Sequence, residues 1–319
     1  MIRIRQFTVN KNDSGQRLDK FLLKLMPSIP ESLLHRYLRE KRIKLNGKKE
    51  PLNTRLSEGD KIELYIKDEF FEKESRESIL KLVPNLHIVF EDDKVLLVDK
   101  VPGLIVHSDE KNETDTLINR VLAYLYQKGE WDPKNENSFI PALCNRIDRN
   151  TGGIVICAKT AEALRCINEL IKNRELDKKY LALVHGIPEK KSGKISNWLL
   201  KNPDTNTVTV YHKPHKNALE AHSLYRVLKS SRERDMSLVE VELLTGRTHQ
   251  IRAQFADMGH ALVGDGKYGV NRDDKRLGYK FQALYSYKLT FQPKSPDSPL
   301  AYLKGREFEV DSVFFKDEI

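Results

Sequence analysis

One short polar stretch, residues 145–153, carries the side chains best suited to chemistry, and it leads directly into an apolar segment, residues 154–158. Within it Asp148 stands between Arg146 and Arg149. Flanking cations keep a carboxylate ionised, as a nucleophile must be, and they attract an anionic partner such as an RNA backbone. Loops at strand ends are where rigid scaffolds present reactive groups. Taken alone, this pattern is more typical of an ion-paired loop residue, so the other segments must decide between the two interpretations.

The polar stretch, NRIDRNTGG at residues 145–153, resembles the signature segment of the RluA-type pseudouridine synthases. The resemblance extends to KKYLALVHG at residues 178–186. It is strongest at LTGRTHQIR, residues 244–252, which is followed by MGHALVGD at residues 258–265. KVPGLIVH at residues 100–107 resembles the family's opening strand and turn. Because these motifs follow one another in the family's order, the chain is identified as a member of the RluC/RluD-like type.

The resemblance implies a catalytic site built on Asp148, Tyr180 and Arg247. Asp148 corresponds to the nucleophile. Arg247 corresponds to its basic partner, which keeps the carboxylate ionised under a flipped base through charge-assisted hydrogen bonds. Tyr180 matches the tyrosine that stacks on the uracil and is a candidate general base. Because an ordinary phenol titrates at about pH 10, stacking is the role we expect. Lys178 is expected to support the same site.

The two arginines of the signature segment are expected to contact RNA. Arg146 matches the family's arginine that fills the stack left by an everted nucleotide, and Arg149 follows the nucleophile directly. A uridine inside folded RNA must be flipped out to reach a carboxylate in a cleft, at a cost of roughly a few kcal/mol. A planar cation that replaces the lost stacking offsets part of this cost.

The implied reaction is an isomerisation that needs no cofactor, because the uracil N1–C1′ bond breaks, the base rejoins through C5, and no atoms are gained. GDGKYG at residues 264–269 fits the G-x-G-x-x-G pattern. A dinucleotide site would require that pattern between a strand and a helix of a βαβ unit, and here it matches the family's Gly-Asp-x-x-Tyr-Gly turn. The chain has no G-x-x-x-x-G-K-[ST] sequence, so no nucleotide cofactor is expected. His249 and His260 are interpreted as structural or RNA-contacting residues, and no metal site is expected.

Residues 1–70 are predicted to form a small α+β domain that resembles the S4 RNA-binding domain. Apolar residues at helical spacing predict two helices, over residues 18–25 and 33–38, and an Asn-Gly turn with alternating strands follows. Cations dominate the second helix and the turn after it, where S4 domains grip structured RNA: Arg36, Arg39, Lys41, Arg42, Lys44, Lys48 and Lys49. Such a run is more often only a solvated face. We expect RNA contacts from Arg17, Arg36, Arg39, Lys41 and Arg42.

Residues 71–86 are charged and without clear periodicity, which predicts a linker, and residues 87–319 are predicted to form the catalytic domain. An apolar–acidic–apolar pattern over residues 88–100 indicates a hairpin. Helical spacing follows near residues 117–125 and 163–171, and further strands are predicted at residues 154–158, 180–185, 208–211, 221–227 and 237–243. This order predicts an α+β domain around a mixed, largely antiparallel sheet, the pseudouridine synthase fold that the resemblance also implies.

Composition agrees with an RNA partner. Lys and Arg number 55 against 46 Asp and Glu, a net charge of +9, which favours association with a polyanion. The three cysteines show no paired spacing, which is typical of a reduced cytoplasmic protein. No apolar run approaches the roughly 20 residues of a membrane span, so we expect a cytoplasmic monomer without a membrane partner.

The expected substrate is a set of uridines in large-subunit (23S) ribosomal RNA or in a ribosome-assembly intermediate. Transfer RNA is the alternative within the family. A catalytically silent RNA-binding protein of ribosome assembly is the alternative from another class. Asp148, Tyr180 and Arg247 are all present, which favours an enzyme. Asn145 and Gly152 stand where the family more often has histidine and serine, and such departures bear on the subfamily and hence on the target uridine.

Overall fold

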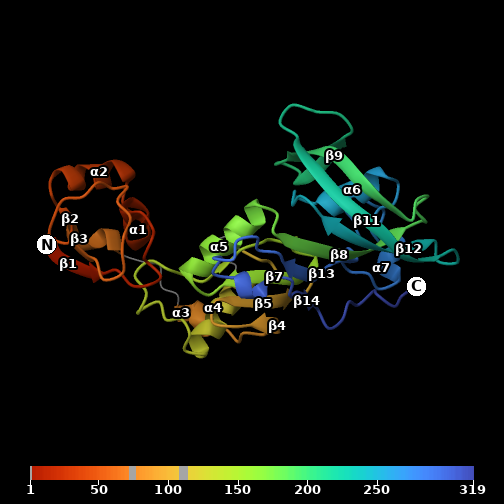
Figure 1. The fold of residues 1–319 in the computed structure, drawn as a ribbon. Coiled ribbons are helices and arrows are strands. Elements are labelled where there is room, and N and C mark those ends of the chain that lie inside the picture. Colours follow the sequence, from red (N-terminus) through yellow and green to blue (C-terminus); the bar gives the residue numbers. More distant parts are fainter. Residues whose placement is uncertain (1, 72–76, 108–113) are drawn as a thin grey trace. The chain divides into compact units, whose positions relative to one another are not determined.

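The computed structural model describes residues 2–71, 77–107 and 114–319, and contacts divide the chain into two compact units (Figure 1). The first unit consists of Met1–Asn85 with Asn119–Ala142 and Lys159–Glu162. The second consists of Leu86–Ile118, Leu143–Ala158 and Ala163–Ile319. Residues 72–76 of the predicted linker lie outside the described residues. The proposed domain limits at residues 70 and 87 stay a prediction.

The first unit contains a three-stranded antiparallel sheet with two helices. Its main elements are β1 (Ile2–Thr8), α1 (Leu18–Leu25), α2 (Glu31–Arg39), β2 (Ile43–Leu45) and β3 (Lys61–Lys67). The sheet has the order β1-β3-β2. Both predicted helices and the strands β2 and β3 are confirmed. Strand β1 was not anticipated, because its partner β3 is distant in the sequence.

Buried polar contacts fix the segment that follows β1. Asp13 is fully buried and accepts hydrogen bonds from Ser138 Oγ at 2.6 Å and Asn137 Nδ2 at 2.7 Å, and Gln16 Nε2 donates to Ser138 Oγ at 2.9 Å. All four residues belong to the first unit. The segment around Ser138, which the sequence assigned to the catalytic domain, therefore depends on residues near the N-terminus. The short helices η1 (Asp68–Phe71) and α3 (Glu77–Leu80) follow β3.

The second unit is organised around an eleven-stranded sheet with the order β10-β9-β11-β12-β8-β13-β7-β5-β4, to which β6 and β14 add at β7 and β13. Its strands are β4 (His87–Glu91), β5 (Val95–Lys100), β6 (Ala142–Leu143), β7 (Gly152–Ala158), β8 (Leu176–His185), β9 (Ser192–Asn202), β10 (Thr207–Tyr211), β11 (Leu219–Ser231), β12 (Met236–Leu243), β13 (Leu284–Phe291) and β14 (Glu307–Glu309). The pairing of β13 with β7 is parallel, and the neighbouring pair of β13 with β8 is antiparallel. The predicted α+β fold with a mixed, largely antiparallel sheet is confirmed.

Helices cover this sheet at two places (Figure 1). The helical elements in this part of the chain are α4 (Leu117–Gln127), α5 (Ala161–Lys172), α6 (Gln250–Asp257), α7 (Arg272–Arg276) and η2 (Ala301–Leu303). Ile167 and Leu170 of α5 join the core around β5, β7, β8 and β13. Ile251 and Phe255 of α6 join a second core with residues of β8, β11 and β12. No helix in the described ranges has the length and apolar character that crossing a bilayer requires.

Candidate active site

Asp148 lies in the loop between β6 and β7, at the start of a strand whose residues are all buried. Two glycines let this strand begin against β13, where Gly152 faces Tyr285 and Gly153 faces Ser286. A Cβ on Gly152 would lie 2.2 Å from the Tyr285 ring, and one on Gly153 would lie 2.2 Å from the Ser286 carbonyl oxygen. The close approach of β7 and β13 therefore requires glycine at both positions. It places the Asp148 loop next to these two paired strands of the sheet.

Arg252 on α6 is the cation that binds Asp148. Its Nη1 donates to Asp148 Oδ2 at 2.7 Å, while Nε and Nη2 donate to the two oxygens of Asp265 at 2.7 and 2.8 Å. The side chains of Arg252 and Asp265 are 8% and 0% exposed, against 27% for Asp148. Burial alone would lower the pKa of Arg252, but the hydrogen bonds and charges of Asp265 and Asp148 raise it. Arg252 is thus a permanent, immobilised cation beside the carboxylate of Asp148.

The predicted ion pair between Asp148 and Arg247 is wrong. Arg247 is exposed, and its Nε donates to the carbonyl oxygen of Glu220 at 2.9 Å. The reason is the start of α6: Arg247 lies in the loop before the helix, and Gln250 Oε1 holds this loop by accepting the Arg247 backbone N–H at 3.1 Å. Arg252 lies inside the helix on its buried side. Both arginines stand in the motif LTGRTHQIR, so the sequence offered the right segment and the wrong residue.

The two carboxylate oxygens of Asp148 have different surroundings. Oδ2 accepts the hydrogen bond from Arg252. Among the described residues no donor reaches Oδ1 within hydrogen-bond distance. A carboxylate with one oxygen fixed and the other open to a cleft is oriented and still able to act as a nucleophile.

Tyr180 and Lys178 lie on the same strand, β8, next to the Asp148 loop. Tyr180 is buried and hydrogen-bonded to Ser286, and burial raises its pKa to about 12. A phenol with this pKa keeps its proton at neutral pH, so the ring is better suited to packing on a base than to removing a proton. Burial lowers the pKa of Lys178. Its Nζ lies beside Gly246, in the loop that carries Arg247, at 4.0 Å from the place that a Cβ on this glycine would occupy.

Lys100, at the end of β5, holds the loop that carries Asp148. It was not predicted as a site residue. It is 1% exposed, and its Nζ donates to the carbonyl oxygens of Val101 at 3.0 Å, Leu104 at 2.8 Å and Arg149 at 2.8 Å. Burial lowers the pKa of Lys100 to about 7. Three carbonyl acceptors require three N–H donors, which only the ammonium form supplies. The signal in the sequence was a lysine at the end of a strand that begins with four apolar residues.

One cleft of about 1200 Å³ brings together Asp148, Tyr180 and Arg252. It is lined by every residue of the second unit for which a site role was predicted: Arg146, Asp148, Arg149, Lys178, Tyr180 and Arg247. Arg146 and Arg149 are exposed at this cleft, as contacts to a polyanion require. Within the described residues no cluster of three or more His, Cys, Asp and Glu side chains could hold a metal ion.

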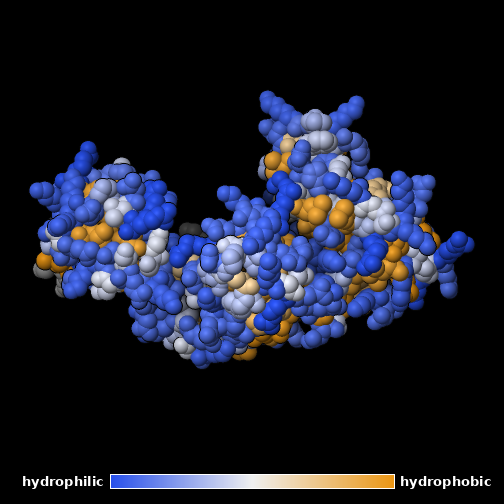
Figure 2. Space-filling view, viewed as in Figure 1, coloured by the Kyte–Doolittle hydropathy of each residue, from blue (hydrophilic) through white to orange (hydrophobic). Residues whose placement is uncertain are grey.

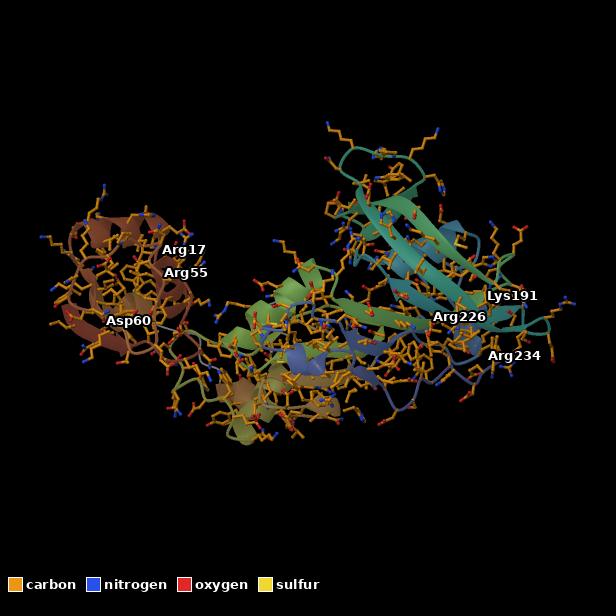
Figure 3. All side chains as sticks on the ribbon, viewed as in Figure 1. Arg17, Arg55, Asp60, Lys191, Arg226 and Arg234 are labelled. Atoms are coloured by element: carbon orange, nitrogen blue, oxygen red, sulfur yellow. The ribbon has the colours of Figure 1, made fainter. Side chains whose placement is uncertain are left out.

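The predicted RNA-contacting cations of the first unit are exposed or half-exposed. Arg36, Arg39 and Lys41 are exposed at the end of α2, and Arg42 is half-exposed and paired with Glu40 at 2.8 Å. Arg17 pairs with Asp19 and forms a β-bridge with Arg55, and Figure 3 shows both arginines near each other on this unit. The face of the unit drawn in Figure 2 is mostly hydrophilic over α2. Arg36 and Arg42 both lie near Glu40, at 3.8 and 2.8 Å, and the exposed cations are accessible to a partner.

Comparison with known proteins shows which family this chain is similar to. Residues 94–257 match the family described as RNA pseudouridylate synthase. The chain is 37% identical over 304 residues to an uncharacterized RNA pseudouridine synthase of Mycoplasma genitalium, with 93% of this chain and 92% of the relative covered. It is 31% identical over 313 residues to ribosomal large subunit pseudouridine synthase D of Neisseria meningitidis, with 91% and 76% covered. The fold is similar to that of human RNA pseudouridylate synthase domain containing 1, with a TM-score of 0.53 and 22% identity over 73% of this chain and 93% of that one.

Proposed function

The chain belongs to the RNA pseudouridylate synthase family and is an isomerase that acts on RNA, and on this premise we propose that its targets are uridines of large-subunit (23S) ribosomal RNA. The relative from Neisseria meningitidis supports this substrate, because its name assigns it to the large ribosomal subunit and the match covers 91% of this chain. We propose further that the enzyme is cytoplasmic and acts as a monomer. The monomer is supported by the second unit, which alone carries Asp148, Tyr180 and Arg252 around one cleft.

The observation that carries the proposed chemistry is the asymmetry at Asp148. Arg252 fixes Oδ2 at 2.7 Å and is itself clamped by the buried Asp265, which leaves Oδ1 of this cleft-lining residue as the proposed nucleophile. In the reaction the uracil N1–C1′ bond breaks and a C5–C1′ bond forms. The proton leaves C5, and N1 gains one. The product has the same composition as the substrate. The carboxylate is therefore regenerated, and no cosubstrate is consumed.

The remaining cleft residues position the nucleotide. Tyr180 offers an aromatic surface for the detached uracil, and its high pKa favours stacking over proton removal. Arg146 and Arg149 flank the nucleophile and are exposed, which suits them to phosphate contacts and to filling the gap that an everted base leaves. Arg247 is assigned to RNA contact in place of its predicted role as the partner of Asp148.

The first unit is proposed to bind RNA outside the target nucleotide, in the manner of an S4-like domain. Arg17, Arg36, Arg39, Lys41 and Arg42 are the residues we assign to this role, and the exposure of Arg36, Arg39 and Lys41 supports it. Exposed cations of this kind neutralise phosphates and release counterions, which strengthens binding without reading the sequence.

Mapping pseudouridines in ribosomal and transfer RNA from cells with and without the protein tests this proposal. Loss of specific pseudouridines from large-subunit RNA, restored by the wild-type gene and not by Asp148→Asn, is the expected result. Sites lost only from transfer RNA would overturn the substrate and favour the alternative within the family. An unchanged map, together with purified enzyme inactive on every transcript, would favour a silent RNA-binding protein.

A further inference from the structure

A histidine that the proposed mechanism leaves unused also faces Asp148. His249 stands directly before α6 with a φ of 51°, in the left-handed region that few side chains adopt. Its ring is 8% exposed, and Nε2 lies 3.8 Å from Asp148 Oδ2. On the other side, Nδ1 lies 2.8 Å from the hydroxyl oxygen of Tyr268, which comes from the GDGKYG turn. Strained backbone at a buried ring next to a reactive group points to a role for that ring.

Hydrogen bonding determines which ring nitrogen carries the proton. The backbone N–H of Val208 donates to the Tyr268 hydroxyl oxygen at 2.8 Å, so this oxygen already accepts one bond. Within the described residues the His249 ring is the one remaining partner of that hydroxyl. If His249 Nδ1 were protonated, it would donate to the same oxygen, and the hydroxyl proton would be left without an acceptor. The arrangement is satisfied when Tyr268 donates to an unprotonated Nδ1.

The ionisation of both groups agrees with this direction. Burial raises the pKa of Tyr268 to about 12, so its hydroxyl keeps the proton that it donates. Burial lowers the pKa of His249, which favours the neutral ring at physiological pH. The charged groups around the ring act in opposite directions: Asp148 and Asp265 raise its pKa, and Arg252 and Lys267 lower it.

We propose that Tyr268 fixes His249 as the neutral tautomer with its proton on Nε2, so that the imidazole presents a donor to Oδ2 of Asp148 and leaves Oδ1 as the reacting oxygen. The distance of 3.8 Å is too long for a hydrogen bond in the free enzyme. Hydrogen bonds of this kind tighten when substrate binds and water is excluded. His249 is therefore a positioning residue that acts through Asp148, and this inference rests on the nucleophilic role proposed for that carboxylate.

A neutral donor suits this position better than a second cation. Arg252 already supplies one positive charge to Oδ2. Another full charge would stabilise the carboxylate further and weaken it as a nucleophile, whereas an Nε2–H group fixes its orientation with little added charge. The bonds Val208–Tyr268–His249 and Asp265–Arg252 then converge on the same oxygen of Asp148.

The tautomer can be measured directly in the full-length protein. Long-range ¹H–¹⁵N NMR correlations of protein labelled with ¹⁵N-histidine distinguish the two neutral tautomers and the imidazolium, and the spectrum of His249→Gln identifies the signals of His249. We expect Nε2–H in the wild type, the same state in Asp148→Asn, and loss of the preference in Tyr268→Phe. An Nδ1–H ring or an imidazolium at neutral pH in the wild type would overturn the proposal, whatever the enzyme's substrate proves to be.

Kinetics separate a positioning role from a contact with RNA. The amide nitrogen of His249→Gln reaches the place of Nε2, whereas that of His249→Asn reaches only the place of Nδ1. We expect kcat to fall about 10- to 100-fold in the asparagine variant and in Tyr268→Phe, with KM for RNA unchanged, and to recover largely in the glutamine variant. The matched control His212→Asn, at a histidine that is 75% exposed, should behave as wild type.

Two kinetic outcomes would contradict the proposal when thermal unfolding shows the variants to be folded. One is equal activity of His249→Gln and His249→Asn, which would show that the donor position does not matter. The other is an effect on KM alone, which would make His249 an RNA contact. Failure of the nucleophilic role itself would appear separately, as turnover in Asp148→Asn with the His249 tautomer unchanged.

Discussion

The cations of the first unit and those around Asp148 belong to the same residue types and differ in their access to water. Arg36 is 59% exposed and lies 3.8 Å from Glu40, which is 41% exposed. Arg252 is 8% exposed and binds an Asp265 that water does not reach. Exposed ion pairs contribute about 0–1 kcal/mol each. Removing one partner of a buried pair costs about 3–5 kcal/mol, because the other charge is left uncompensated.

This difference separates two uses of positive charge. The exposed cations of the first unit have at most weak pairs that water screens, so each should add a similar, salt-sensitive increment to RNA affinity. The buried Arg252 joins Asp148 to Asp265, so the effects of substituting these three residues should not be additive. The predictions below test this contrast, beginning with the carboxylate at the centre of the buried network.

Asp148→Asn should abolish turnover while leaving RNA binding intact. The substitution keeps the shape of the side chain and removes its charge, and loss of a catalytic nucleophile typically costs about 10⁴-fold or more in rate. Single-turnover pseudouridine formation and an RNA-binding titration measure the two properties. Asp177→Asn, another carboxylate that lines the cleft, is the matched control and should keep most of its activity. Near-normal turnover in Asp148→Asn would remove Asp148 from the mechanism.

Arg252→Met should damage both stability and catalysis, and Arg247→Met should damage neither to the same degree. Loss of Arg252 strands the buried Asp265 and frees Asp148, so we expect a loss of about 3–5 kcal/mol in the free energy of unfolding and roughly 10²–10³-fold in kcat/KM. Arg247 is exposed, and its loss should change stability by less than about 0.5 kcal/mol and act mainly on RNA affinity. Denaturant unfolding and kinetics on one RNA substrate compare them. Equal effects of the two variants would erase the contrast between buried and exposed cations.

Lys100→Met should lower stability by about 2–3 kcal/mol, since three carbonyl oxygens lose the donor that the buried Lys100 supplies. One of these oxygens belongs to Arg149, so kcat should fall as the neighbouring Asp148 loosens. The exposed Lys304→Met serves as the control and should leave the unfolding midpoint unchanged. A Lys100→Met protein as stable and active as the control would show that the loop is held by other contacts.

The stability that Asp265 provides should disappear in acid. Burial alone would raise the pKa of Asp265, but the hydrogen bond and charge of Arg252 hold it below the usual carboxyl value. A group whose pKa is lower in the folded state contributes stability that is complete above its unfolded pKa, about 3.9, and is lost as pH falls through the folded pKa. In Arg252→Met the largest remaining effect on Asp265 is burial, which raises its pKa, so the stability gap between wild type and this variant should be largest near neutrality and narrow as the pH falls toward and below about 4. Urea midpoints at several pH values measure it, and a gap that widens in acid would reverse the assigned sign.

Arg36→Gln and Arg39→Gln in the full-length chain should give the smallest effects. If each cation neutralises one phosphate, each substitution should lower the slope of log affinity against log salt by about 0.7–0.9, with stability and turnover at saturating RNA unchanged. Full-length variants are preferable to deletion of residues 1–70, because Asp13 and Gln16 bond to Ser138. Lys67→Gln, an exposed lysine on β3, is the control. A slope that no substitution alters would remove these cations from the RNA interface.

Much of the fold could be predicted because its signals are local. Apolar periodicity located α1, α5, β3 and β12, and their confirmation rests on patterns that a helix or strand repeats along its own length. Strands β9 and β13 were missed. The sequence LYSYKLTF of β13 does alternate, yet its central place, parallel to β7 and antiparallel to β8, depends on partners far away in the chain.

The sequence by itself determined the candidate nucleophile Asp148, the strand that carries Tyr180, and the order of the motifs that form the cleft, because each is contained within a few adjacent residues. Only the tertiary structure decided which arginine binds Asp148. Arg247 and Arg252 share one motif, and the packing of α6 through Ile251 and Phe255 turns the second inward and leaves the first in water. The same holds for Lys100 and Tyr268, each of which has a partner in a segment distant in the sequence, Arg149 and His249 respectively. Ion pairs and hydrogen bonds act over a few ångströms, and a linear sequence pattern does not show which residues lie that close in space.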